Sequence, residues 1–214
     1  MDASLGSWLG LFGLGAFHGI NPGMGWLFAV ALGMQEGRRS AVLRALGPLA
    51  AGHVLAVVAA LALAAALGAV VPATALRWPI AGLLVGLGVY RLWRRRHPRW
   101  VGMRVGAGGL TCWSFLMASA HGAGLMVIPL LIGVRCAAGA SPGGCQCGAA
   151  ATRDPGLGIL TTLVHGGGYL LVMAAVALLV FEKVGLAGLR RAWLNVDLVW
   201  AGALVATGVL TVVL

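Results

Sequence analysis

Long apolar stretches alternate along the chain with short basic segments. A membrane-spanning helix needs about 20 mostly apolar residues. Six stretches approach or exceed this length: Leu5–Met34, Ala45–Leu76, Trp78–Trp93, Val105–Val134, Gly156–Phe181 and Leu194–Leu214. The last contains the only acidic residue within these runs, Asp197. The pattern predicts an all-α integral membrane protein with six transmembrane helices.

The composition agrees with this prediction. Of the 214 residues, 60% are hydrophobic and 9% are charged, whereas soluble domains carry about 25% charged residues. These values exclude a soluble globular protein, a disordered tail and a nucleic-acid-binding module. The net charge of +10 reflects only five acidic residues against fifteen basic ones. In a membrane protein such an excess sets orientation and contacts anionic lipid, so we expect membrane lipid and no nucleic acid as partner.

The basic residues predict the orientation. Twelve of the fifteen lie in or beside the segments after the first, third and fifth stretches, and the other three are Arg77, Arg135 and Arg153. Because cytoplasmic loops are rich in Lys and Arg, we expect both termini outside the cytoplasmic (inner) membrane of a bacterium. The N-terminal Met1-Asp2-Ala3-Ser4 lacks the basic segment of a signal peptide, so the first helix is expected to be retained. Trp78, Trp93, Trp113 and Trp193 lie near predicted helix ends, as an interfacial aromatic belt requires.

Six helices divide into two halves of three, residues 1–97 and 98–214, within one membrane domain. Since three is odd, the second half would be inserted upside down. Two short matches support such a repeat: Phe17-His18-Gly19 corresponds to Ala120-His121-Gly122, and His53 corresponds to His165. Inverted repeats are typical of secondary transporters, whose substrates bind near the membrane midplane. Chance is the alternative explanation for so short a match.

Four of the five histidines fall inside predicted spans: His18, His53, His121 and His165. Ionisable groups inside a membrane are costly and usually face a pathway. Counted from the helix ends, His18 and His121 lie near the centre, His53 nearer the cytoplasm and His165 nearer the outside. This order predicts two central ligands with one gate-side ligand on each face. Imidazole binds metals and also carries protons near neutral pH, so the spacing leaves both open, and a structural hydrogen bond is the alternative for each histidine.

The segment from Gly15 to Met24 predicts a broken helix. Pro22 lacks a backbone donor and clashes with the preceding turn, and Asn21 adds a polar amide beside it. Carbonyls freed by the break must be satisfied by protein, water or substrate. The glycines keep a small-xxx-small spacing that also suits close helix packing. The expected substrate-pathway residues are Gly19, Asn21, Pro22 and Gly23, and His165-Gly166-Gly167-Gly168-Tyr169 is predicted as a second weak point.

Sulfur-containing residues offer further candidate ligands. Met117 precedes His121 by four residues and so shares its helical face, and Met24 follows His18 within two turns. Thioether and imidazole together favour copper(I) or another soft-to-borderline ion; ordinary apolar packing is the alternative.

Three cysteines, Cys136, Cys145 and Cys147, lie in the expected outer loop. Two of them could form a disulfide in an oxidising compartment. Alternatively, the Cys145-Gln146-Cys147 segment could bind a metal, and the odd third cysteine mildly favours a metal or another partner.

The segment His18-Gly19-Ile20-Asn21-Pro22-Gly23-Met24 resembles the signature of the nickel/cobalt exporter (NicO) family, His-Gly-Leu-Glu-Pro-Gly-His on an early helix. More broadly, Asn21-Pro22-Gly23 and the apolar run ending at Gly33 are similar to the lysine-exporter superfamily. This resemblance implies about six helices in two inverted halves and His18 as a metal ligand. Asn21 replaces the family's acidic residue, Met24 its second histidine and arginines its histidine-rich loop. These departures argue against nickel and cobalt and suit a softer ion or a non-metal substrate.

These observations predict a secondary transporter, not an enzyme, that moves a transition or heavy-metal cation through a histidine-lined midplane site. The ion would be the substrate, with no prosthetic group, and no nucleotide-binding motif is present. A proton-coupled exporter of an amino acid or other small organic solute is the alternative. A thiol-reductant conductor would need paired cysteines inside the membrane, and only Cys112 is available. A non-transporting membrane subunit or chaperone for a metalloenzyme is a further alternative. Gly6, Gly10, Gly82 and Gly86 are spaced to pack helices either within one chain or across a homo-oligomer.

Overall fold

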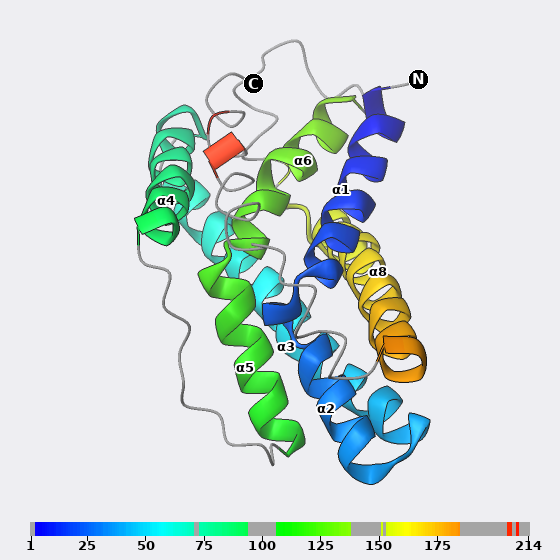
Figure 1. The fold of residues 1–214 in the computed structure, drawn as a ribbon. Coiled ribbons are helices and arrows are strands. Elements are labelled where there is room, and N and C mark those ends of the chain that lie inside the picture. Colours follow the sequence, from blue (N-terminus) through cyan, green and yellow to red (C-terminus); the bar gives the residue numbers. More distant parts are fainter. Residues whose placement is uncertain are drawn as a thin grey trace.

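The computed structural model describes residues 3–70, 73–93, 106–137 and 153–184, together with positions 151, 205, 206 and 209. Every regular element within these ranges is helical (Figure 1). The elements are α1 (Ala3–Ile20), η1 (Pro22–Met24), α2 (Trp26–Glu36), α3 (Arg39–Val70), α4 (Ala73–Trp93), α5 (Ala107–Ala120), α6 (Ala123–Ala137), α8 (Pro155–Leu179) and the π turn η2 (Val180–Val184). The predicted sixth helix, Leu194–Leu214, lies almost entirely outside the described residues, and so does Asp197.

Two helical stretches in this part of the chain are long and apolar enough to cross a membrane. They are Arg39–Leu67, within α3, and Pro155–Lys183, which combines α8 with most of η2. Helices α5 and α6 are bent by 61° relative to each other and supply a third crossing if the bent pair is one span. The all-α prediction is therefore confirmed for the described residues. Six spans and an inverted repeat stay predictions.

The predicted break at Pro22 is confirmed. The expected span Leu5–Met34 consists of two helices, α1 and α2, with the single 3₁₀ turn η1 between them. Asn21 is extended, Pro22 opens η1, and Gly25 has a φ of 125°. Such a φ is open to glycine and strained for other residues. The local sequence therefore ends α1 at Ile20 and starts a new helix, α2, at Trp26.

A second break lies where the sequence predicted none. The expected span Val105–Val134 is divided into α5 and α6 at His121 and Gly122, and Gly122 has a φ of 68°. The weak point predicted at His165–Tyr169 is wrong, because α8 runs through it without interruption. The reason is tertiary packing: a Cβ at Gly168 would meet the Phe12 carbonyl of α1. This glycine serves a close helix contact and leaves the helix intact.

Helix α1 lies along α8, and α3 lies along α5 (Figure 1). The contact between α1 and α8 depends on glycines, which have no side chain to hold the two backbones apart. A Cβ at Gly15 would meet the His165 carbonyl, and one at Gly19 would lie 2.6 Å from the Tyr169 carbonyl oxygen. Gly52 of α3 likewise faces backbone atoms of α5. Close helix packing is therefore confirmed as a role of Gly15 and Gly19.

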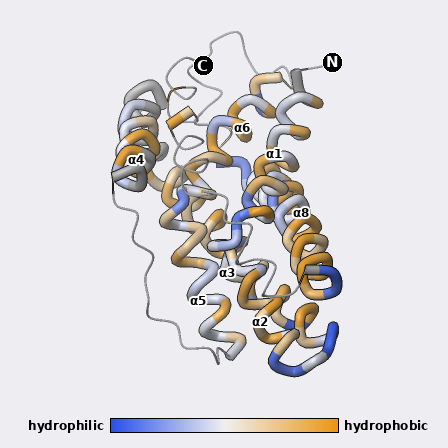
Figure 2. The backbone as a smooth tube through the Cα atoms, viewed as in Figure 1, coloured by the Kyte–Doolittle hydropathy of each residue, from blue (hydrophilic) through white to orange (hydrophobic). Residues whose placement is uncertain are grey.

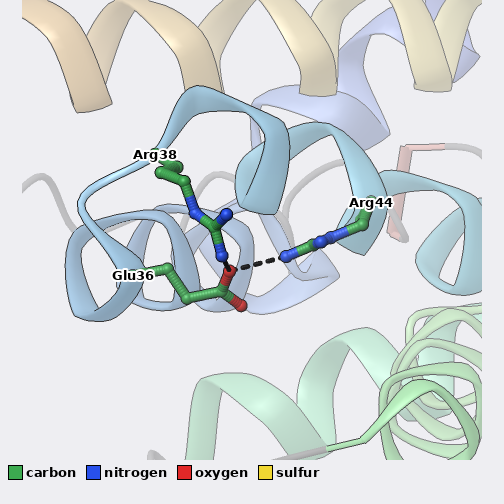
Figure 3. A network of polar contacts seen from close by, with 3 residues as sticks. All are labelled: Glu36, Arg38 and Arg44. Atoms are coloured by element: carbon green, nitrogen blue, oxygen red, sulfur yellow. Dashed lines mark hydrogen bonds and ion pairs between the residues drawn. The ribbon is translucent and has the colours of Figure 1, made fainter.

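Hydrophilic residues concentrate at the turn between α2 and α3 and at η2, whereas most of the helical body is apolar (Figure 2). At the turn between α2 and α3, the Glu36 carboxylate accepts from Arg38 at 3.1 Å and from Arg44 at 2.6 Å (Figure 3). Arg39 also pairs with Glu182 of η2, at 3.4 Å. Because these groups are largely exposed, each pair contributes little stability.

The N-terminal end of α8 carries a further ion pair. Asp154 accepts from the backbone N–H of Leu157 and so caps the helix, and it also pairs with Arg135 of α6 at 3.3 Å. The described ion pairs therefore lie near the helix termini.

We expect Gly15→Ala to destabilise the protein by about 1–3 kcal/mol, the usual cost of adding a methyl group to a packed contact. Gly13→Ala is the matched control, since a Cβ at this exposed position of the same helix meets nothing within 4 Å. The control should be neutral or slightly stabilising, because alanine favours helix over glycine. Thermal unfolding of both variants in detergent measures the difference, and equal midpoints would contradict the α1–α8 contact.

Candidate histidine-lined site

The four histidines singled out in the sequence are all buried. His18, His53 and His165 are 0% exposed, and His121 is 1% exposed. They come from four different elements: α1, α3, α8 and the break between α5 and α6. Such burial of polar rings requires hydrogen-bond partners.

His18, His53 and His165 pack against one another, and we call these three residues the histidine cluster. Their ring centroids lie 5.1 to 5.4 Å apart. The Nε2 atoms of His53 and His165 are 3.1 Å apart, within hydrogen-bonding distance.

The predicted order of depths is therefore wrong for His53 and His165, which were expected at opposite faces and are in contact. The start of α3 explains the difference. The helix begins at Arg39 and has 32 residues, so His53 lies about 21 Å from its start and near its middle. The apolar run begins at Ala45, six residues after the true start of the helix. The sequence therefore placed His53 too close to a helix end.

Backbone carbonyls orient two of the rings from within their own helices. The Nδ1 of His18 lies 2.7 Å from the Leu14 carbonyl oxygen, and the Nδ1 of His121 lies 2.7 Å from that of Met117. A carbonyl oxygen can only accept, so each Nδ1 carries a hydrogen and donates it. In the neutral ring the Nε2 atom then keeps its lone pair.

The positions of the ring hydrogens of His165 and His53 follow in the same way. His165 Nδ1 donates to the Leu11 carbonyl of α1 at 3.3 Å. In the neutral cluster its Nε2 therefore accepts, and His53 Nε2 is the donor. The Nδ1 of His53 is buried and has no hydrogen-bond partner among the described residues. The His53 ring stacks on Tyr169, with centroids 4.0 Å apart and planes 10° apart.

Aromatic donors satisfy the carbonyls freed by the break after α1. In an apolar environment an unpaired backbone group is costly. The three bonds are Trp26 Nε1 to the Ile20 carbonyl at 2.9 Å, Trp113 Nε1 to that of Gly23 at 3.1 Å, and the Tyr169 hydroxyl to that of Met24 at 2.9 Å. These roles were not predicted from the sequence, which placed Trp113 in an interfacial belt. The available signal was an indole or phenol within an apolar run, whose polar atom needs a partner.

Asn21 joins the two breaks. Its Oδ1 accepts from the Gly23 backbone N–H at 2.9 Å, which orients the amide, and its Nδ2 lies 3.5 Å from His121 Nε2. A Cβ at Gly23 would lie 3.3 Å from the Met117 Cε atom. We call Asn21, Gly23, Met117 and His121 the break junction. All four residues were predicted as site residues from the sequence, and the fold brings them together.

The other predicted site residues differ in burial and in their distance from the break junction. Met24 is 0% exposed beside the junction, Pro22 is half-buried at the start of η1, and Gly19 packs against α8. Cys136 is exposed near the end of α6, whereas Cys145 and Cys147 lie outside the described residues. The disulfide and the thiolate metal site therefore stay predictions.

The described residues hold no group of three or more His, Cys, Asp or Glu side chains placed to bind a metal ion together. The histidine cluster is instead closed on itself by the hydrogen bond between His53 and His165. What the arrangement offers chemically is a set of buried Nε2 lone pairs, a shared proton and an adjacent amide.

No protein-family model, no curated protein and no solved structure matches this chain. The resemblance of residues 18–24 to the nickel/cobalt exporters therefore rests on the motif alone.

Tyr169→Phe should lower the free energy of unfolding by about 1–3 kcal/mol, because it leaves the buried Met24 carbonyl without its donor. The substitution keeps the aromatic ring that stacks on His53. Tyr90→Phe is the matched control, since Tyr90 is 56% exposed on α4. Thermal unfolding in detergent compares the two variants, and a Tyr169→Phe midpoint equal to that of Tyr90→Phe would show that the hydroxyl bond does not matter.

Proposed function

We propose that the chain is a secondary transporter that moves a transition-metal cation across the bacterial inner membrane through the histidine cluster. One observation carries the proposal: His53 and His165, from two different long helices, meet through Nε2 atoms at 3.1 Å inside an apolar body. Histidines that bind metals usually donate their other ring N–H to a carbonyl or carboxylate. His18, His121 and His165 each have such a carbonyl on Nδ1, so Nε2 is the nitrogen of each neutral ring that could bind a metal.

A cation would compete with a proton for this site. The hydrogen bond between His53 and His165 uses the lone pair that a metal would need. Two nitrogens bound to one tetrahedral metal at 2.0–2.1 Å lie about 3.3 Å apart, close to the separation between these two atoms. Binding would break this hydrogen bond after small ring movements, and the hydrogen on His53 Nε2 would move to Nδ1 of the same ring, which has no partner among the described residues. A contact that re-forms in this way suits a cargo that must also leave.

The arrangement of helices supports two inverted halves, residues 1–97 and 98–214. In each half a helix breaks beside a histidine, at Asn21 or at His121, and a long helix with a buried histidine follows, α3 or α8. The first helix of each half packs against the long helix of the other: α1 on α8, and α5 on α3. Rocking of one half against the other would then open the site to alternate sides. The motif at residues 18–24 supports the same class.

His53→Gln and His165→Gln should each reduce metal flux into proteoliposomes by roughly tenfold or more, because each removes from the cluster an Nε2 atom that would bind the metal. His97→Gln is the control and should transport normally, since His97 is the one histidine outside the predicted spans. A metal-sensitive dye trapped in the vesicles measures the flux. Normal flux in both cluster variants would contradict the proposed site.

A second candidate is a proton-coupled exporter of an amino acid or other small organic solute. The absence of a three-ligand group among the described residues favours it, and an imidazole–imidazole hydrogen bond can transfer a proton without any metal. The same vesicles separate the two functions. Solute efflux driven by a pH gradient, without metal flux, would replace the first proposal with this one.

A further inference from the structure

Basic side chains from three neighbouring segments gather at one end of the bundle (Figure 2). Arg38 lies in the turn between α2 and α3, Arg39 and Arg44 lie in the first two turns of α3, and Lys183 lies in η2. Helix α2 packs against both α3 and η2, and the ion pair between Arg39 and Glu182 joins α3 to η2. We call Arg38, Arg39, Arg44 and Lys183 the basic patch.

The basic patch keeps an excess of positive charge. Glu36 and Glu182 are the acidic side chains that pair with its arginines, whereas Asp154 lies at the opposite end of α8. Four basic side chains against two acidic ones leave two positive charges in excess. The side chains of the three arginines are 62 to 65% exposed, so an anion from outside the protein can reach them.

Glu36 holds two of these arginines side by side. The Nη2 atoms of Arg38 and Arg44 contact the same carboxylate oxygen, at 3.1 and 2.6 Å (Figure 3). Each contact uses one nitrogen of a guanidinium group that carries five N–H donors. Guanidinium groups bind phosphate oxygens through paired hydrogen bonds. Two of them fixed on one carboxylate therefore offer a prearranged site for a phosphate.

The basic patch lies where two candidate membrane spans end. Arg39 is the first residue of the apolar stretch Arg39–Leu67, and Lys183 is the last residue of the stretch Pro155–Lys183. A helix that crosses a membrane changes from apolar to charged residues at the level of the lipid headgroups. In a bilayer crossed by these two helices, the patch lies at the level of the phospholipid phosphates.

Exposed apolar side chains adjoin the basic patch on the same helices. Leu43 is 48% exposed and follows Arg39 by one turn, on the same face of α3. Leu179 is 59% exposed and ends α8 directly before η2. A soluble phosphate would use only the charged groups. A phospholipid would use both, because its acyl chains would contact the leucines while its phosphate contacts the arginines.

We infer that the basic patch binds the phosphate of an anionic phospholipid, whose acyl chains lie along the exposed surfaces of α3 and α8. Clusters of Lys and Arg beside membrane helices attract anionic headgroups. This inference is independent of the cargo, and it holds for a transporter of a metal as well as for an exporter of an organic solute.

The test is a lipid titration of the full chain in detergent, with bound lipids counted by native mass spectrometry. Phosphatidylglycerol and phosphatidylcholine with identical acyl chains are compared. Phosphatidylglycerol should bind at least about tenfold more tightly, and equal binding of the two lipids would overturn the inference. Glycerophosphoglycerol, which is the same headgroup without acyl chains, should compete poorly. Competition as strong as that of the intact lipid would identify a soluble phosphate ester as the occupant.

Three double variants test whether the patch is the site. Arg38→Gln/Arg44→Gln should weaken phosphatidylglycerol binding by roughly tenfold or more, because it removes two positive charges. Arg38→Lys/Arg44→Lys keeps both charges and should bind within about threefold of the original protein. Arg135→Gln/Arg153→Gln removes two charges at the other end of the bundle and should bind normally.

Two results with these variants would overturn the inference. An equal loss of binding in both glutamine variants would show a general attraction of the protein to anionic lipid, with no site at the basic patch. A lysine variant as weak as Arg38→Gln/Arg44→Gln would show that positive charge does not explain the binding.

Discussion

The rest of the structure depends on the close approach of α1 to α8. Gly15, Gly19 and Gly168 let the two backbones touch, and every polar contact across this interface requires that separation. The contact brings the Leu11 carbonyl to His165 and the Met24 carbonyl to Tyr169. Tyr169 in turn stacks on His53 of α3. A wider helix pair would lose the ring orientation as well as the packing.

A second constraint follows from breaking helices inside an apolar body. Each break frees backbone groups that cannot find water, so side chains must replace the lost partners. Here the donors come from Trp26, Trp113 and Tyr169, and Asn21 satisfies an N–H at the same turn. The break is therefore held rigidly from three helices, and Asn21 is oriented toward His121. Asn21 and Gly23 therefore take part in the hydrogen bonds that hold the break and also belong to the predicted substrate pathway.

The distribution of charge agrees with this interior. The ion pairs lie where the helices end, and the buried rings are oriented by carbonyls instead of carboxylates. Neutral hydrogen bonds to backbone carbonyls hold the rings of His18, His121 and His165 in place. The acidic side chains that the structure describes, Glu36, Asp154 and Glu182, lie at helix ends and not beside these rings.

Local chemistry was enough to predict part of this arrangement. Apolar run lengths indicated helices, Pro22 between glycines indicated the first break, and histidines inside uncharged stretches indicated the buried polar residues. Each of these signals acts within one or two helical turns, so sequence alone carries it. Tertiary structure decided three other features. They are the second break at Gly122, the uninterrupted course of α8 through Gly166–Gly168, and the contact of His53 with His165. A glycine in the sequence is compatible with a helix break and with a close helix contact. The partner of a buried histidine comes from a helix that is distant in the sequence. The packing of α1 on α8 and of α3 on α5 therefore decides which glycines break a helix and which histidines meet.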